Sequence, residues 1–226
     1  MFKSLWRTFR RQINLIRTMG SIFWSVLYGI FRISKLPHQP VTIFGGARLG
    51  LDSIYSKKAR ELAHRLADAG IPVLTGGGPG IMEAANCGAI EVKKGVITTL
   101  GITVSGLELN GQPKSCNVDV IVMNNYGARK WLLIHYAVGF AVFPGGFGTL
   151  DELMELLTLI QTKFRVKAPI VLIGKEYWKP FLDWIMNSAL KEKLIDPHDA
   201  QLFVLTDDID EAFSILVRET SQPKNS

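Results

Sequence analysis

The chain has 226 residues, of which 47% are hydrophobic, and a formal net charge of +6. This size suits one globular domain with a sizeable core and an added arm. Residues 1–35 hold seven basic residues and no acid, which leaves 26 − 7 = 19 basic against 20 acidic residues in the body. A nucleic-acid enzyme would carry its positive patch on the folded domain, so we expect no nucleic-acid partner.

The N-terminal arm, residues 1–36, is predicted to be an amphipathic basic helix followed by an apolar run. Apolar residues from Leu5 to Ile16 recur at helical spacing, with basic residues on the other side. The apolar run from Ile22 to Phe31 is too short for a bilayer core, which needs about 20 residues. The arm is therefore expected either to lie on an anionic membrane surface or to pack on the body or a partner subunit.

After Pro37 and Pro40, short apolar strands alternate with longer helical patterns as far as Arg218, and residues 219–226 are predicted to be a disordered tail. Strands are expected at 41–44, 72–75, 96–104, 119–123, 140–143, 170–173 and 203–205. Helices are expected at 53–69, 81–93, 128–138, 150–163, 178–191 and 209–218. This alternation predicts an α/β, Rossmann-like, doubly wound parallel sheet over residues 37–218, with ligands at the carboxyl ends of its strands.

Two isolated cysteines, Cys87 and Cys116, show no C-x-x-C spacing. We expect them to be small apolar fillers in a reducing, cytoplasmic compartment rather than metal ligands or a disulfide. The histidines also lack metal-ligand spacing, so we expect neither a metal nor another cofactor.

Three glycine-rich turns follow predicted strands, after Phe44, Thr75 and Phe143. The third is the most informative, because the turn 144–148 leads directly into a helix that begins with a hydroxyl and two acids. Glycines let the backbone approach a ligand closely, and free N–H groups at a helix N-terminus attract phosphate. The turn therefore predicts a phosphate site with the Glu152 carboxylate beside it. It lacks the Gly-Lys-Ser/Thr ending of a P-loop, which disfavours a Walker-type nucleotide hydrolase.

Both charged features of this region have structural alternatives. Thr149 and Glu152 fit the capping box S/T-x-x-E, in which the two side chains only cap the helix. Arg129 and Lys130 open a predicted helix, where cations oppose the macrodipole. They are either partners of an anion or solvated surface residues, and the sequence leaves both questions open.

Residues 76–86 (GGGPGIMEAAN) and 144–152 (PGGFGTLDE) resemble the LOG ("lonely guy") family, once labelled "possible lysine decarboxylases". The resemblance covers about residues 40–215. It implies a usually dimeric, Rossmann-like phosphoribohydrolase that hydrolyses the N-glycosidic bond of a nucleoside 5′-monophosphate. The products are free base and ribose 5-phosphate, and the substrate is AMP-like or a cytokinin riboside 5′-monophosphate.

The resemblance implies that Arg129 and Glu152 are the catalytic pair. Together with the glycine turns, it predicts a substrate site made of Gly45, Arg48, Gly77, Gly78, Met82, Glu108, Lys130, Gly145, Gly146, Phe147, Gly148, Thr149, Leu150, Asp151 and Thr158. The loop at 106–110 departs from the Pro-containing pattern of many relatives, so the base pocket is less defined than the phosphate site.

A non-catalytic nucleotide or molybdenum-cofactor carrier of the same fold is the alternative. Such a carrier would keep the glycine turns but has no need of Glu152 with Arg129. A decarboxylase would need a pyridoxal-binding lysine in a supporting context, and the sequence shows none.

Overall fold

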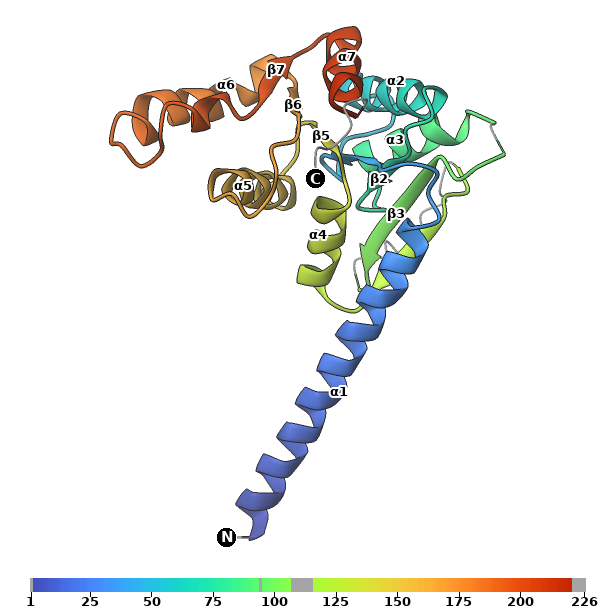
Figure 1. Cartoon of the computed structure of the whole chain (residues 1–226), viewed down its shortest axis with the longest axis vertical. Coiled ribbons are helices and arrows are strands. Elements are labelled where there is room, and N and C mark those ends of the chain that lie inside the picture. The colour runs from blue at the N-terminus through green and yellow to red at the C-terminus, as the bar shows by residue number, and fades with distance from the viewer. Residues whose placement is uncertain (1, 94, 107–115, 221–226) are drawn as a thin grey trace.

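The computed structural model describes residues 2–93, 95–106 and 116–220. Its described strands form one seven-stranded sheet in the order β4-β3-β2-β1-β5-β6-β7. All neighbouring strands run parallel. The chain moves from the central β1 out to β4 and then continues from β5 on the other side of β1 (Figure 1). The predicted doubly wound α/β fold is confirmed.

The strands are β1 (Val41–Phe44), β2 (Val73–Thr75), β3 (Thr99–Val104), β4 (Val120–Met123), β5 (Gly139–Val142), β6 (Ile170–Ile173) and β7 (Val204–Thr206). The α-helices are α1 (Phe2–Ile33), α2 (Ile54–Asp68), α3 (Ile81–Ile90), α4 (Tyr126–His135), α5 (Phe147–Gln161), α6 (Lys175–Trp184) and α7 (Ile209–Thr220). A π-helical turn, η1 (Ile185–Ala189), extends α6, and a 3₁₀ turn, η2 (Asp199–Gln201), precedes β7.

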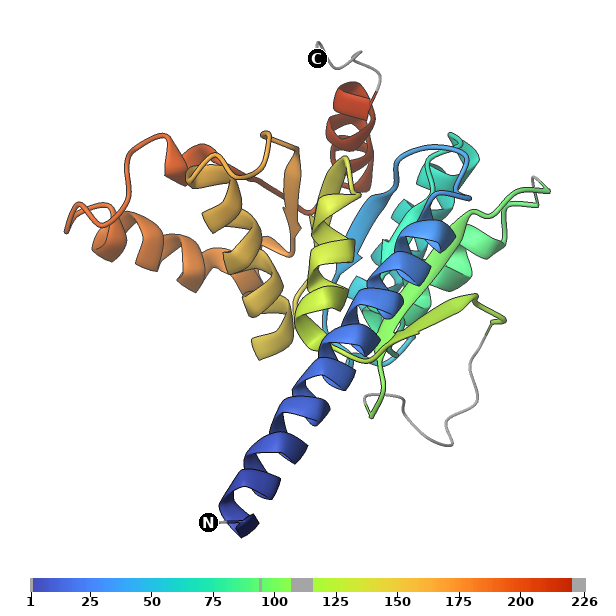
Figure 2. The ribbon, with the colours of Figure 1, turned by 60° about the horizontal axis from the view of Figure 1, so that its bottom comes forward.

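Helices cover both faces of the sheet, because successive side chains of a buried strand point to opposite faces. In β5, Phe140 and Val142 join the core beneath α4 and α5, together with Trp178 of α6. Ala141, on the opposite face of β5, joins the core beneath α2, α3 and α7. Figure 2 shows α1 lying beside α4 on the first of these faces.

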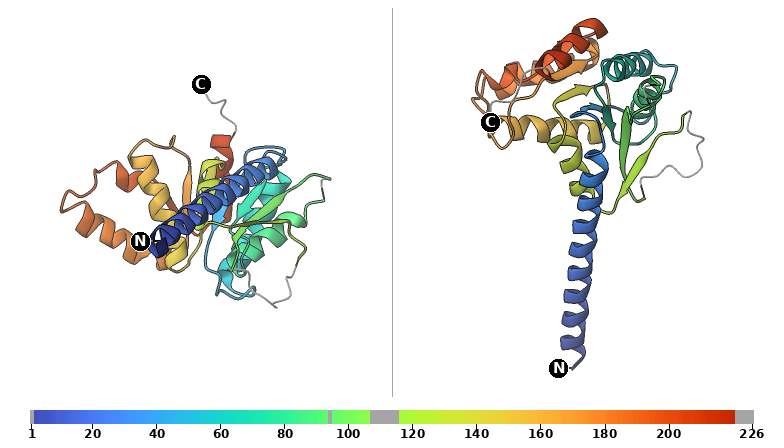
Figure 3. Two further views of the ribbon diagram at one scale, coloured as in Figure 1. Left: turned by 90° about the horizontal axis from the view of Figure 1, so that it is seen from below. Right: turned by 45° about the vertical axis from the view of Figure 1, so that its right-hand side comes forward.

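The arm forms one continuous helix, α1, rather than a short helix followed by a separate apolar run. No proline occurs before Pro37, so nothing in the sequence breaks the helix. The C-terminal part of α1 contacts α4 and β4, whereas its N-terminal part extends away from the body (Figures 1 and 3). None of the described helices combines the length and apolar character needed to cross a bilayer.

The expectation of two unpaired cysteines is wrong, because Cys87 and Cys116 form a disulfide. Cys87 lies on α3 and Cys116 lies shortly before β4, so the pairing depends on how the chain folds across β3. A separation of 29 residues gives no local signal for it. The argument for a reducing compartment rested on unpaired cysteines and therefore no longer holds.

Several predicted boundaries also shift. Helix α4 begins at Tyr126, two residues earlier than predicted, because the Asn125 side chain accepts a hydrogen bond from the Ala128 N–H at 2.9 Å. Helix α7 continues to Thr220, and residues 221–226 of the predicted tail lie outside the described residues.

Candidate functional site

The three glycine-rich turns meet at the carboxyl ends of β1, β2 and β5. The Gly46 N–H donates to the Pro144 carbonyl at 2.9 Å, and the Ile81 N–H donates to the Gly46 carbonyl at 3.2 Å. Strand order reverses here, since β1 lies between β2 and β5. Such a switch point is where open α/β sheets bind their ligands.

The turn after β5 leads straight into α5, with Gly146 as the N-cap residue. The Leu150 N–H donates to the Gly146 carbonyl at 3.0 Å. The N–H groups of Phe147, Gly148 and Thr149 precede it in the first turn, where no carbonyl is available within the helix. These three donors make this end of α5 suited to a phosphate.

This geometry corrects the capping-box interpretation. Thr149 lies inside the first turn of α5 and is buried, whereas the N-cap position belongs to Gly146, which makes no side-chain capping hydrogen bond. Thr149 and Glu152 therefore do not form the reciprocal pair that a capping box requires. The capping-box alternative that the sequence left open is excluded, because the helix begins two residues before Thr149.

The turns are packed so closely that several of their glycines leave no room for a side chain, as Gly145 and Gly76 illustrate. A Cβ on Gly145 would lie 2.9 Å from the Gly46 nitrogen and closer still to the Thr149 side chain. A Cβ on Gly76 would overlap the Arg129 guanidinium. Glycine at these positions lets the first turn of α5 and the arginine approach the strand ends.

Arg129 and Glu152, the predicted catalytic pair, lie together at this edge of the sheet. Arg129 Nη1 is 3.4 Å from Glu152 Oε1, and each residue is only 7% exposed. Arg129 Nε also donates to the Ile102 carbonyl at 2.8 Å, and its Nη2 contacts the Gly76 carbonyl at 3.5 Å. The arginine therefore joins the backbone of β3 and the turn after β2 to the carboxylate on α5.

Burial raises the pKa of Glu152 from its ordinary 4.5 to about 7, and the positive charge of Arg129 opposes this rise. The nearby Asp151 carboxylate adds to the rise, whereas Lys130 lowers the pKa. A carboxyl group that titrates near neutrality can exist in both protonation states under working conditions. This is the property expected of a group that handles protons or stabilises charge in a reaction.

Lys130 lies beside this pair but is engaged on α5. Its Nζ is 2.8 Å from Asp151 Oδ2 and 2.5 Å from Glu155 Oε2. The Lys130 side chain is only 13% exposed. The two acids are four residues apart and so lie on one side of α5. Lys130 thus neutralises two carboxylates that flank Glu152.

Two tyrosines that the predicted site did not include also contact the turn after β5. The Tyr177 hydroxyl, in the first turn of α6, donates to the Gly145 carbonyl. The Tyr126 hydroxyl lies 3.9 Å from the position of a Cβ on Gly148, and its ring lies 5.4 Å from the Arg129 guanidinium carbon. For Tyr126 the sequence offered a signal, since it opens the helix that carries Arg129. For Tyr177 it offered none.

The remaining predicted residues divide into those near the turns and those away from them. Met82, at the start of α3, fills the space beside Gly76 and Gly78. Arg48 is exposed in the turn after β1. Thr158 is exposed further along α5, where its hydroxyl donates to the Met154 carbonyl at 2.7 Å.

Glu108, the predicted contact to the base, lies in the segment 107–115, outside the described residues. Phe147, by contrast, is the first residue of α5 and is 93% exposed.

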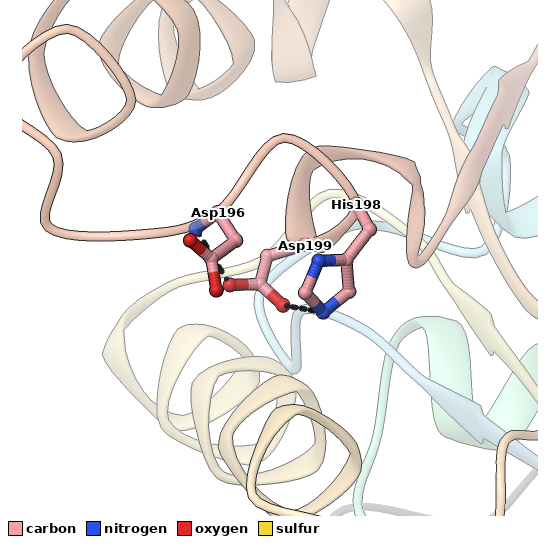
Figure 4. Close-up of side chains that lie close together, drawn as sticks. All are labelled: Asp196, His198 and Asp199. Carbon is pink, nitrogen blue, oxygen red and sulfur yellow. Dashed lines mark hydrogen bonds and ion pairs between the residues drawn. The ribbon is translucent and has the colours of Figure 1, made fainter.

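A second cluster, Asp196, His198 and Asp199, lies before β7, on the segment that contains η2 (Figure 4). Asp199 Oδ2 accepts hydrogen bonds from the Asp196 N–H at 2.9 Å and from Gln161 Nε2 at 2.6 Å. His198 Nε2 lies 3.2 Å from Asp199 Oδ1. By accepting the bond from Gln161, the buried Asp199 carboxylate holds this segment against the end of α5.

A family model described as "Possible lysine decarboxylase" matches residues 82–216, which is more than half of the chain. The chain belongs to this family. The match includes the α3 segment, both members of the Arg129–Glu152 pair and the turn after β5. It confirms the family that the two glycine-rich motifs indicated.

Two relatives in the family carry a specific activity in their names. A protein of Oryza sativa subsp. japonica, named cytokinin riboside 5′-monophosphate phosphoribohydrolase LOG, is 28% identical over 168 residues, which are 74% of this chain and 67% of the relative. A protein of Rhodococcoides fascians, named cytokinin riboside 5′-monophosphate phosphoribohydrolase, is 25% identical over 184 residues, which are 79% and 89% of the two chains.

Solved structures outside these relatives share the fold. The molybdenum cofactor carrier protein of Chlamydomonas reinhardtii superposes with a TM-score of 0.56 at 21% identity, covering 82% of this chain and 99% of its own. The molybdenum cofactor binding protein of Rippkaea orientalis gives a TM-score of 0.56 at 20% identity, with coverages of 80% and 98%. At these identities the likeness concerns the fold alone.

Proposed function

We propose that this protein hydrolyses the N-glycosidic bond of nucleoside 5′-monophosphates and releases free base and ribose 5-phosphate. The observation that carries the proposal is the Glu152 carboxyl group, buried against Arg129 at 3.4 Å and one turn into a helix whose first N–H groups are free to bind phosphate. A phosphate site and an acid of raised pKa at one sheet edge suit a phosphorylated ribose.

In this mechanism the N–H groups of Phe147, Gly148 and Thr149 hold the 5′-phosphate. Binding the phosphate away from the reacting bond positions the sugar against the carboxylate. Cleavage of the glycosidic bond builds positive, oxocarbenium-like charge on the ribose. The Glu152 carboxylate stabilises that charge and orients or deprotonates the attacking water.

Arg129 keeps the reacting carboxylate in place. Its Nε is committed to the Ile102 carbonyl, so its guanidinium plane is fixed while Nη1 faces Glu152. Its positive charge favours the carboxylate over the neutral acid, which keeps part of the population ready to react near neutral pH.

The relatives' names support the substrate class, a nucleoside 5′-monophosphate. Within this class, the substrate is AMP-like or a cytokinin riboside 5′-monophosphate. A cofactor carrier with this fold would not need the buried Glu152 and Arg129, which supports an enzyme over a carrier. A decarboxylase is disfavoured because Lys130, beside the pair, is engaged with two carboxylates.

We further propose that the protein is a homodimer. Large apolar side chains stay exposed beyond the end of α5, with Phe164 at 86% and Val166 at 81%, and exposed apolar groups of this kind often mark subunit interfaces. Light scattering on the purified protein measures the mass and tests this proposal.

We also propose that residues 1–35 contact an anionic membrane at its cytoplasmic face. The support is the division of charge between a basic arm and a near-neutral body. Negatively charged lipids attract basic segments of this kind.

A panel of nucleoside monophosphates tests the proposed activity. Each nucleotide is incubated with purified protein, and free base and ribose 5-phosphate are separated by chromatography. We expect release from AMP or another monophosphate, and none from the matching nucleoside, which lacks the phosphate. Absence of release from every monophosphate would shift the assignment to a carrier.

A further inference from the structure

The C-terminal half of α1 has two apolar faces, and only one of them meets the body. Ile22, Val26 and Ile30 pack against the core beneath α4, and Ile33 is buried in it. The neighbouring positions face outward, with Trp24 70% exposed and Phe31 57% exposed. Phe23 and Leu27 are also exposed. Burial of the first face therefore leaves a second apolar face uncovered on the part of α1 that is fixed to the body.

The N-terminal part of α1 extends from the body (Figure 3). Exposed apolar side chains continue along this part of the helix. Side chains spaced by three, four or seven residues share one side of a helix. We define the α1 stripe by the exposed residues with this spacing: Trp6, Ile13, Ile16, Trp24, Leu27 and Phe31. Gly20, where an added Cβ would have no heavy atom within 4 Å, lies in the same register between the two halves. The stripe therefore runs past the junction where α1 meets the body.

Several contacts hold α1 to the body at a fixed angle. Arg32 forms an ion pair with Asp119, which lies just before β4. Asn124 Nδ2 donates to Ser21 Oγ at 2.9 Å, twelve residues before the end of α1. Gly29 lets the helix pack directly on Leu132 of α4, because a Cβ there would overlap the leucine side chain. The α1 stripe is therefore a rigid extension of the enzyme rather than a loosely attached segment.

The positive charges next to the α1 stripe favour an anionic partner. No acidic residue occurs before Asp52. Arg10 and Arg17 are exposed on α1, and the Arg10 guanidinium lies 4.1 Å from the Trp6 ring centroid. A second copy of α1 would bring basic residues against basic residues with no acid to compensate them. Anionic lipid headgroups supply the missing charge, and aromatic side chains such as Trp24 suit the interface below them.

We propose that the α1 stripe docks on an anionic bilayer along its whole length, including the half that is packed on the body. The membrane then holds the catalytic domain in one orientation instead of on a flexible tether. This inference rests on the proposed membrane contact of residues 1–35 and adds the face that makes it.

Vesicle co-sedimentation tests the inference with the full chain and two double variants. The vesicles contain phosphatidylcholine with or without phosphatidylserine. Trp24→Glu/Phe31→Glu alters the body-attached half of the α1 stripe, and Trp6→Glu/Ile13→Glu alters the extended half. Leu194→Glu, at an apolar position outside α1 that is 73% exposed, is the matched control. Ribose 5-phosphate release and circular dichroism confirm that each variant is folded.

We expect the wild type and the Leu194 variant to sediment with phosphatidylserine vesicles, and each double variant to bind at least about tenfold more weakly. Wild-type binding by the Trp24/Phe31 variant, with loss only in the Trp6/Ile13 variant, would overturn the rigid docking but keep a membrane tether. Equal sedimentation of all forms would reject the arm as the membrane contact. If instead the wild type does not bind vesicles and is a dimer, and the Trp24/Phe31 variant is a monomer, the α1 stripe would be an interface with a second copy of the chain.

Discussion

Two groups of basic side chains in this chain differ in their burial and in the acidic partners available to them. Arg129 and Lys130 are almost buried, and each faces carboxylates on α5. Arg10 and Arg17 are exposed on α1, in a stretch of sequence that contains no acid. Burial makes an unpaired charge costly, so the first group must find its partners within the fold. The second group has no such constraint and remains available to a partner outside the chain.

Among substitutions that test this difference, replacing the buried Arg129 should have the largest effect. Arg129→Met leaves Glu152 buried without its counter-charge and frees the Ile102 carbonyl. We expect the free energy of unfolding to fall by about 3–5 kcal/mol. We expect activity to fall more than about a hundredfold. Denaturant titration at pH 8 measures the first quantity. Arg48→Met, at an exposed position, is the control and should stay within about 0.5 kcal/mol of the wild type. Equal stability of the two variants would contradict a structural role for Arg129.

A smaller effect is expected from the turn that brings α5 to the strand ends. Gly145→Ala places a Cβ against Thr149 and the Gly46 nitrogen, so we expect a loss of about 1–3 kcal/mol. Gly146→Ala is the matched control, since nothing lies within 4 Å of its Cβ position and its φ is −91°. Thermal unfolding of both variants checks the difference. Comparable losses at the two glycines would show that close packing of the turns is not what requires Gly145.

The smallest effect concerns the pH dependence of activity. Lys130→Met removes a cation and leaves Asp151 and Glu155 unneutralised, so the pKa of Glu152 should rise further. The rise of kcat/KM with pH should then occur at higher pH, with a loss of about two- to fivefold at pH 7. Lys179→Met, an exposed lysine on α6, should leave the profile unchanged. An unchanged profile with weakened substrate binding would instead identify Lys130 as a substrate contact.

The sequence predicted those features that depend on neighbouring residues. Alternation of strands and helices predicted the sheet, and the turn after Phe143 placed Glu152 beside a helix N-terminus. Features that depend on distant segments were missed. The disulfide joins Cys87 to a segment beyond β3, and Tyr177 reaches the Gly145 carbonyl from α6, which follows the next strand of the sheet. The capping-box alternative is excluded for a local reason, because α5 begins at Phe147, two residues earlier than the Thr149 pattern indicates.

The most direct test of the central claim compares wild type and Glu152→Gln in AMP hydrolysis from pH 5 to pH 9. In the proposed mechanism the carboxylate is the reacting form, and burial raises the pKa of Glu152 to about 7. The wild-type kcat/KM should therefore be low at pH 5 and rise through pH 7 to a plateau. The glutamine variant should bind AMP but release ribose 5-phosphate at least about a hundredfold more slowly, without this pH dependence. Wild-type turnover by Glu152→Gln would contradict the proposed mechanism.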